Sequence, residues 1–261
     1  MSAKMDLIFF SPTGSTGEVF DELQRVLAED AKGTWEVAAA NVTMAANRGV
    51  TRSYGAEDAL VVGFPVYAGR VPVPFLQELQ GLRGQDTPVA IVASFGNRHF
   101  DDALLEAADT LAANGFVVVA AAAFSCEHSF TAKVGTGRPD DADLAIAADF
   151  ARQLLAKLAE PAPAAVEVPG NSPYTQAPPM SIFTPLTSDD CIGCLACVEV
   201  CPTAAISSDD PAVVSASCIG CGACINACAV DAKIYPAEVI TPIIGMLEAN
   251  CTARREPVLV L

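Results

Sequence analysis

Two stretches, Cys191–Pro202 (CIGCLACVEVCP) and Cys218–Cys228 (CIGCGACINAC), carry one cysteine spacing. Each contains C-x2-C-x2-C-x3-C, and every cysteine of the second stretch lies 27 residues after its counterpart in the first. Three thiolates at i, i+3 and i+6 can surround three irons of a cubane, whereas the same short turn cannot reach the fourth corner. Structural zinc favours two C-x2-C pairs farther apart, and disulfide frameworks are typical of secreted chains. The eight thiols therefore indicate two [4Fe–4S] clusters rather than either alternative.

The size and charge of the chain limit its partners. Its 261 residues suffice for one medium domain and one small one, and its formal net charge is −16. This charge argues against binding to nucleic acid or anionic membranes, and it suits docking onto basic faces of redox partner proteins; a surface charge that serves solubility alone is the alternative. The longest apolar run, 116–124, is too short to span a membrane, and the N-terminus lacks the shape of a signal peptide. We expect a cytoplasmic protein.

A proline-rich stretch divides the chain. Residues 159–190 hold seven prolines and show neither helical nor strand periodicity. We therefore predict four parts: a first domain over 1–158, a linker over 159–186, a cluster-binding domain over 187–236 and a C-terminal extension over 237–261.

The first part alternates between strand-like and helix-like patterns. Apolar runs predict strands at 5–10, 35–40, 59–64, 89–95 and 116–124. Apolar residues at helical spacing predict helices around 19–27, 75–79, 104–112 and 144–158. This alternation predicts an α/β fold with a doubly wound, five-stranded parallel sheet. Such sheets bind ligands beyond the carboxyl ends of their strands.

The loop after the first predicted strand, Ser11–Gly17 (SPTGSTG), has the composition of a phosphate cradle. Hydroxyls and backbone N–H groups that open onto a helix N-terminus bind anions. The loop has no lysine, so it is not a nucleoside-triphosphate P-loop, and it suits a single phosphate. An ordinary turn with a helix cap is the alternative.

Three loops together resemble those of flavodoxins. Ser11–Gly17 is similar to the flavodoxin loop that binds the 5′-phosphate of FMN, and Gly63–Pro72 and Ser94–Asp102 resemble the two loops that flank the flavin. With the cysteine repeat, the whole chain resembles the flavodoxin–ferredoxin fusion ("ferrodoxin"-type) proteins of anaerobes. This resemblance implies a flavodoxin-like FMN-binding domain followed by a small α+β ferredoxin domain of the bacterial 2[4Fe-4S] type.

The resemblance also implies the cofactors, FMN and two [4Fe–4S] clusters, and their ligands. In bacterial ferredoxins the fourth cysteine of each run binds the other cluster, which implies one set of Cys191, Cys194, Cys197 and Cys228 and another of Cys218, Cys221, Cys224 and Cys201. The implied phosphate ligands are Ser11, Thr13, Gly14, Ser15 and Thr16. The implied flavin flanks are Pro65, Val66, Tyr67 and Gly69 on one side and Gly96, Asn97, Arg98 and Phe100 on the other.

The chain departs from the flavodoxin pattern in its charges. Flavodoxins often keep the flavin in an acidic setting, whereas Arg70 and Arg98 lie in the two flavin loops here. We hypothesise that they stabilise a reduced, anionic flavin or hold an anionic substrate; surface arginines are the alternative. His99 and His128 follow strands near the predicted flavin and are candidates for proton relay; exposed loop histidines are the alternative. Cys126 is expected to be buried and inert, with a reactive thiol as the alternative.

These patterns predict an oxygen-sensitive electron-transfer protein that passes electrons between the clusters and FMN. One alternative is an enzyme, an FMN-dependent reductase of a small electron acceptor that is supplied by its own clusters. Another is a ferredoxin joined to a docking domain without flavin. The chain has no G-x-G-x-x-G motif, so we expect electrons to arrive from a partner protein and not from NAD(P)H.

Overall fold

Five parallel strands form the centre of the first domain in the computed structural model, which describes residues 3–31 and 33–261. The strands are β1 (Ala3–Phe9), β2 (Trp35–Asn41), β3 (Ala59–Pro65), β4 (Thr87–Phe95) and β5 (Phe116–Ser125). Their order is β2-β1-β3-β4-β5, and every neighbouring pair is parallel. This is the flavodoxin-like doubly wound order, so the predicted five-stranded parallel sheet is confirmed.

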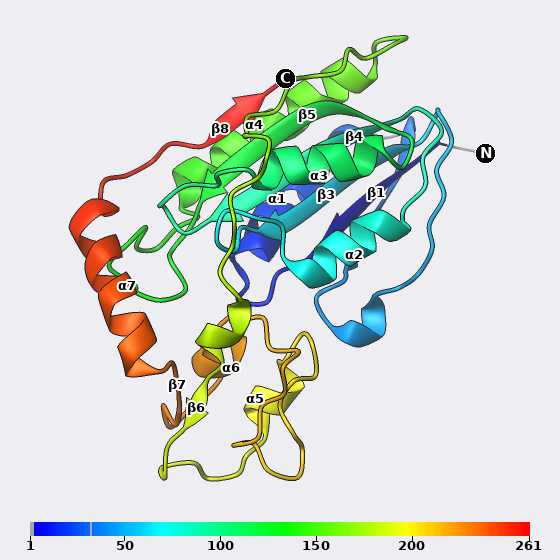
Figure 1. The fold of residues 1–261 in the computed structure, drawn as a ribbon. Helices are drawn as coiled ribbons and strands as arrows, with labels where there is room; N and C mark the ends of the chain where they lie inside the picture. The colour runs from blue at the N-terminus through cyan, green and yellow to red at the C-terminus, as the bar shows by residue number, and fades with distance from the viewer. Residues whose placement is uncertain (1–2, 32) are drawn as a thin grey trace.

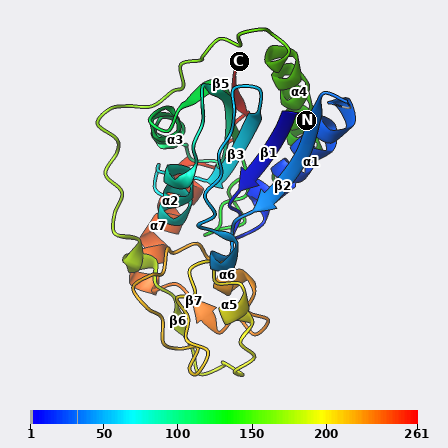
Figure 2. The same ribbon diagram turned by 90° about the vertical axis from the view of Figure 1, so that its right-hand side faces the viewer.

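Helices cover both faces of this sheet (Figures 1 and 2). α1 (Ser15–Asp30) and α4 (Asp141–Leu158) pack on one face, whereas α2 (Val73–Gly81) and α3 (Ala103–Ala112) pack on the other. Every residue of β4 is buried, as a strand covered on both faces requires. Gly63 in β3 is required by this packing, because a Cβ there would lie 1.9 Å from the ring of Phe20 in α1.

A sixth strand, β8 (Val258–Val260), pairs antiparallel with β5. The prediction of five strands did not include it. The chain leaves the first domain after α4, forms the cysteine-rich domain and α7 (Ala237–Asn250), and then returns to the outer edge of the sheet (Figure 1). The predicted C-terminal extension therefore completes the sheet of the first domain.

The cysteine-rich domain is small and repeats its own geometry. A short antiparallel pair, β6 (Leu186–Thr187) and β7 (Lys233–Ile234), brings the two ends of the domain together. One-turn helices α5 (Ala196–Glu199) and α6 (Ala223–Asn226) lie inside the two cysteine runs. The residue before each helix is left-handed, with φ of 63° at Leu195 and 82° at Gly222. The sequence repeat is therefore also a repeat of backbone conformation.

The proline-rich linker is tied to the first domain. The buried carboxylate of Asp102 accepts hydrogen bonds from the backbone N–H of Asn171 (2.7 Å) and of Thr175 (2.6 Å), and from the side chains of both residues. Nearer its start, Val166 N–H donates to the carbonyl of Val118 in β5 (2.9 Å). The linker is thus fixed to the surface of the sheet domain between Val166 and Thr175.

Aromatic packing and one arginine join the two domains. The ring of Phe130, from the loop after β5, lies 5.3 Å from that of Phe183 and 5.0 Å from that of Tyr235. Phe183 belongs to a one-turn helix, η2 (Met180–Phe183), at the end of the linker. A second such helix, η1 (Ala45–Asn47), precedes Arg48, whose guanidinium donates to the carbonyl of Pro202 (2.6 Å). These contacts seat the cysteine-rich domain at the carboxyl end of the parallel strands.

Candidate functional site

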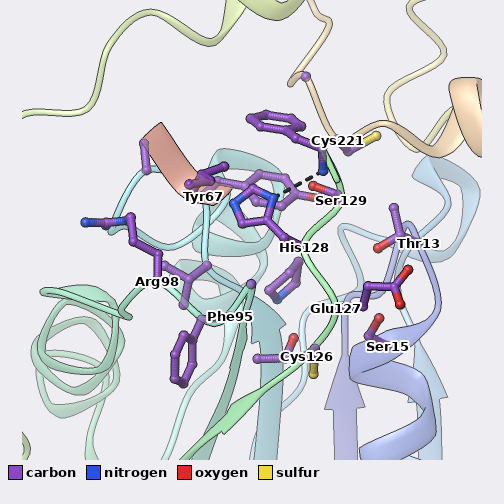
Figure 3. A pocket seen from close by; sticks show the side chains of 18 of the residues that line it. Thr13, Ser15, Tyr67, Phe95, Arg98, Cys126, Glu127, His128, Ser129 and Cys221 are labelled. Atoms are coloured by element: carbon purple, nitrogen blue, oxygen red, sulfur yellow. Dashed lines mark hydrogen bonds between the residues drawn. The ribbon is translucent and has the colours of Figure 1, made fainter. Parts of the chain in front are cut away.

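A cavity of about 310 Å³ lies where the carboxyl ends of the parallel strands meet the cysteine-rich domain (Figure 3). Its volume falls in the range of small-molecule sites, roughly 300–1,000 Å³. Nine of the thirteen predicted FMN-site residues line it: Thr13, Ser15, Thr16, Pro65, Val66, Tyr67, Gly69, Gly96 and Arg98. The three loops that the sequence singled out therefore meet around one cavity.

The loop after β1 is held in shape by its own hydroxyls. Ser11 Oγ accepts a hydrogen bond from Gly17 N–H (2.9 Å), and Thr16 Oγ1 shares one of 2.5 Å with Ser94 Oγ of β4. Gly14 precedes α1 with a φ of 101°, a conformation that favours glycine. Ser11 and Gly14 thus shape the loop without lining the cavity, while Thr13 and Ser15 line it at the N-terminus of α1, where backbone N–H groups have no partner in a preceding turn.

The loop after β3 places a tyrosine in the cavity wall. Tyr67 and Arg70 exchange two backbone hydrogen bonds of 3.0 Å around a tight turn, in which Ala68 and Gly69 have positive φ. A Cβ on Gly69 would lie 2.6 Å from the carboxylate of Asp101. The turn is therefore fixed against the next loop. The Tyr67 hydroxyl is buried and has no hydrogen-bond partner among the residues that the structure describes.

The loop after β4 corrects two predicted flavin contacts. Asn97 does not line the cavity: its side-chain amide donates to the carbonyls of Cys251 (2.7 Å) and Ala253 (2.8 Å) and so binds the C-terminal tail. Phe100 is buried in the core, where its ring stacks on His99 at 4.8 Å and meets the edge of Phe95. In this loop Gly96, Arg98 and His99 face the cavity.

The two arginines of the flavin loops have different roles. Arg70 does not line the cavity, because its guanidinium binds both carboxylate oxygens of Glu106 (2.5 and 2.9 Å) and covers the ring of Tyr174. Arg70 therefore lies outside the wall of the cavity in which it was hypothesised to stabilise a reduced flavin or hold an anionic substrate. Arg98 does line the cavity and pairs with Asp101. Of these two arginines, Arg98 thus brings a positive charge to the cavity wall, and the carboxylate of Asp101 partly neutralises that charge.

A fourth strand end, the loop Cys126–Phe130 after β5, also lines the cavity. Gly96 lets His128 approach, since a Cβ there would lie 2.6 Å from the imidazole. Burial, and then the positive charge of Arg98, lower the pKa of His128 to about 4. Its Nδ1 accepts a hydrogen bond from Phe130 N–H (3.1 Å), so the neutral ring carries its proton on Nε2. His128 is therefore a hydrogen-bond donor at neutral pH.

The same loop brings a thiol and a carboxylate to the cavity. Burial raises the pKa of the Cys126 thiol far above its ordinary value, which agrees with the expectation of an inert cysteine. The carboxylate of Glu127 lies near Thr13 and Ser15 in Figure 3 and accepts a hydrogen bond from Gly137 N–H (2.8 Å). A negative charge therefore stands beside the loop that was predicted to hold a phosphate.

The remaining walls come from segments whose role the sequence did not reveal. The linker supplies Met180 and Phe183, and α7 supplies Ile243, Met246 and Leu247. Because these residues are far from the strand ends in sequence, only the folded chain brings them to the site. The sequence placed His128 of the Cys126–Phe130 loop near the predicted flavin, because ligands lie at strand ends, but no pattern marks the linker and α7 as cavity walls.

The eight motif cysteines surround two smaller hollows. One is lined by Cys191, Cys194, Cys197 and Cys228, and the other by Cys201, Cys218, Cys221 and Cys224. These are the two sets that the ferredoxin resemblance implies. Within residues 3–31 and 33–261, no three His, Cys, Asp or Glu side chains converge closely enough to hold one metal ion. Thiols spread around a hollow suit a multi-iron cluster.

The last cysteine of each run receives the same hydrogen bond. Ala205 N–H donates to Cys201 Sγ and Ala232 N–H donates to Cys228 Sγ, each at 3.2 Å. The proline that follows only the first run therefore leaves this bond unchanged. Burial raises the pKa of Cys221 to about 12 and that of Cys224 to about 11, so these thiols keep their protons at neutral pH unless a metal replaces them.

Cys221 belongs to both sites. It lines the second hollow and also the large cavity, and Gly220 and Phe183 are shared in the same way. The other hollow opens toward the surface, where Cys191 and Cys194 are exposed. The two hollows and the cavity thus form a series from the surface of the small domain to the centre of the site.

Comparison with known proteins identifies the small domain. Residues 185–229 match the family model of the 4Fe-4S dicluster domain. No curated protein matches the chain. No helix in the described part of the chain has the length and apolar character needed to cross a membrane.

Solved structures similar to the first domain include several flavodoxins. One is a short-chain flavodoxin associated with a bacterial microcompartment, at 15% identity and TM-score 0.44, covering 60% of this chain and 99% of that one. Another is flavodoxin 2 from Bacillus cereus, at 17% identity and TM-score 0.43, covering 59% of this chain and 99% of that one. A Fusobacterium nucleatum flavodoxin bound to flavin mononucleotide matches at 14% identity and TM-score 0.39, covering 59% of this chain and 97% of that one. These scores are low, and the strand order defines the fold instead. A flavodoxin-like sheet joined to an iron–sulfur domain agrees with the resemblance to flavodoxin–ferredoxin fusion proteins.

Proposed function

We propose that this chain is an electron-transfer protein that holds FMN in the large cavity and one [4Fe–4S] cluster in each thiol hollow. The observation that carries the proposal is the shared position of Cys221, which lines both the cavity and one hollow. A cluster bound by this thiol would lie directly behind the cavity wall. Iron–sulfur clusters exchange single electrons and FMN can hold two, so such cofactors connect one-electron carriers with two-electron chemistry.

The cavity residues fit FMN. Thr13, Ser15 and the first turn of α1 offer hydroxyl and N–H donors for a phosphate. The Tyr67 ring and the apolar side chains of Val66 and Phe183 offer walls for a flat ring system. Glu127 opposes the phosphate charge but leaves this donor set free, because its own hydrogen bond goes to Gly137. The residues would therefore bind FMN with its phosphate at α1 and its ring toward the small domain.

The outer hollow is the proposed point of exchange with a partner protein. Cys191 and Cys194 are exposed there, and the Ile192 side chain between them is 68% exposed. Exposed carboxylates of Asp189 and Asp190 adjoin this apolar residue. Exposed acidic residues close in sequence to an exposed apolar residue suit a redox partner with a basic face. The cytoplasmic location remains a prediction.

Cofactor analysis after purification without oxygen tests this function. About eight irons, eight sulfides and one FMN per chain are expected, the content that two cubanes and one phosphate cradle require. Eight irons without flavin, even after FMN is added back, would favour the alternative of a ferredoxin with a docking domain. Catalytic turnover with a small quinone that is lost in Cys221→Ser, while FMN stays bound, would favour the reductase alternative.

A further inference from the structure

Lys233 in β7 is a buried cation of the cysteine-rich domain, with only 2% of its surface exposed. Its ammonium donates hydrogen bonds to the hydroxyl of Thr187 (2.7 Å) and to the carbonyl of Pro211. Within residues 3–31 and 33–261, no carboxylate lies close enough to form an ion pair with it. Burial of a charge is costly unless an opposite charge accompanies it, and two neutral oxygens compensate that cost only in part.

This cation belongs to the wall of the outer hollow. Lys233 lines that hollow together with Pro211, the residue whose carbonyl accepts a hydrogen bond from the ammonium. The other residues of the wall are the four cysteines of the outer set and apolar residues. Four thiolates give a bound [4Fe–4S] cluster a net negative charge, which grows when the cluster takes up an electron. A cluster in this hollow would therefore supply the negative charge that the buried lysine lacks.

The internal repeat provides a comparison with the inner hollow, the one that contains Cys221. Ala205 and Ala232 occupy equivalent positions, because each donates its N–H to the last cysteine of its own run at 3.2 Å. Ile206, which follows Ala205, is buried and lines the inner hollow, whereas Lys233 follows Ala232 and lines the outer one. Equivalent positions of two similar hollows thus hold an apolar side chain in one and a charge in the other.

We propose that Lys233 is a compensating positive charge that raises the reduction potential of the cluster in the outer hollow. This inference rests on the proposed function, because it requires a [4Fe–4S] cluster at that place. A fixed cation stabilises the reduced cluster more than the oxidised one, since the reduced form carries the greater negative charge. The step itself is the uptake of one electron from a redox partner, and no bond to Lys233 forms or breaks. Lys233 thereby favours electron uptake at the hollow nearest the proposed docking surface.

Lys233→Met tests this role, because it removes the charge and keeps the length of the side chain. In redox titrations of the full-length protein monitored by electron paramagnetic resonance, we expect the outer cluster to become about tenfold harder to reduce, or about 59 mV more negative. The inner cluster should shift less, and Cys194→Ser, which alters a proposed ligand of the outer cluster, assigns the signals. Thr187→Val is the matched control, since it removes a hydrogen bond to the same ammonium and keeps the charge. An equal shift in Thr187→Val would contradict the proposal, because the hydrogen bonds and not the charge would then set the potential.

Iron content separates this role from a purely structural one. If Lys233→Met binds less iron, Lys233→Gln provides a second neutral side chain, whose amide can donate to an oxygen. An unchanged potential of the outer cluster in either neutral variant, at wild-type iron and FMN content, would overturn the role of Lys233 and leave the proposed function standing. Loss of iron from both neutral variants but not from Lys233→Arg would support the need for a charge, whereas loss from all three would overturn it. A wild-type protein that binds no clusters would overturn the proposed function as well.

Discussion

The guanidinium of Arg48 donates a 2.6 Å hydrogen bond to the carbonyl of Pro202, the residue that follows Cys201 in the cysteine-rich domain. The same side chain donates to the carbonyls of Val42 and Thr43, and it lies 5.8 Å from the ring of Phe10. One cation therefore ties the loop after β2 to the segment that carries a proposed cluster ligand. This bond and the Phe130 ring cluster hold the two domains together.

Arg48→Ala should weaken the domain contact. We expect the free energy of unfolding to fall by about 1.5–3 kcal/mol, the scale of hydrogen bonds to a charged group. Hydrogen exchange should also become faster around residues 200–204. Arg83→Ala is the control, because the Arg83 side chain donates to the nearby carbonyls of Gln80 and Leu82, within the same domain. Equal effects of the two substitutions would contradict an interdomain role for Arg48.

Glu127→Gln should tighten FMN binding. The substitution removes a negative charge near Thr13 and Ser15 and keeps an oxygen that can accept from Gly137. A Coulomb repulsion of roughly 1 kcal/mol in a partly solvated site predicts an FMN Kd about fivefold lower. Flavin fluorescence measures this Kd, and the gain should shrink at high salt. The exposed Glu36→Gln serves as control, and no change in Kd would place the phosphate elsewhere.

The double substitution Thr13→Ala and Ser15→Ala should weaken FMN binding without affecting iron. Each hydroxyl is expected to contribute about 1 kcal/mol to phosphate binding, so the Kd should rise roughly 10- to 30-fold. Iron and sulfide per chain should stay at the wild-type values, because both residues lie in the first domain. Loss of both cofactors together would instead show that the substitutions disrupt the fold.

His128 should make stability depend on pH. Its pKa is lowered to about 4 in the folded chain and is about 6.5 when unfolded, so the unfolded state binds more protons between these values. Stability is therefore lost as the pH falls through this window, by about 2 kcal/mol between pH 7 and pH 5. Denaturant titrations should show that His128→Gln removes this part of the loss. His99→Gln, at the other histidine of the cavity, should retain it.

The sequence was most informative where local spacing determines geometry. Apolar runs such as 59–64 and 89–95 predicted β3 and β4, because fully buried parallel strands need continuous apolar residues. Loops after those strands meet in space because parallel strands end at one edge, which is why Thr13, Tyr67 and Gly96 were found.

Features that depend on distant partners were not predictable. Nothing in the sequence around Asn97 shows that its amide would bind carbonyls 154 and 156 residues away instead of facing the cavity. Likewise, no periodicity links Asp102 to Asn171 and Thr175, or the three residues of β8 to β5. A short segment can satisfy its hydrogen bonds with many partners, and only the assembled chain selects one.

The return of β8 to β5 has a consequence for biosynthesis. Residues 258–260 are translated after all eight motif cysteines, so β5 remains an unpaired edge while the thiol-bearing segment leaves the ribosome. The segment that pairs with this edge follows α7, which lines the cavity, in the chain. Pairing of β8 with β5 can therefore occur only after every residue that would bind iron has been translated.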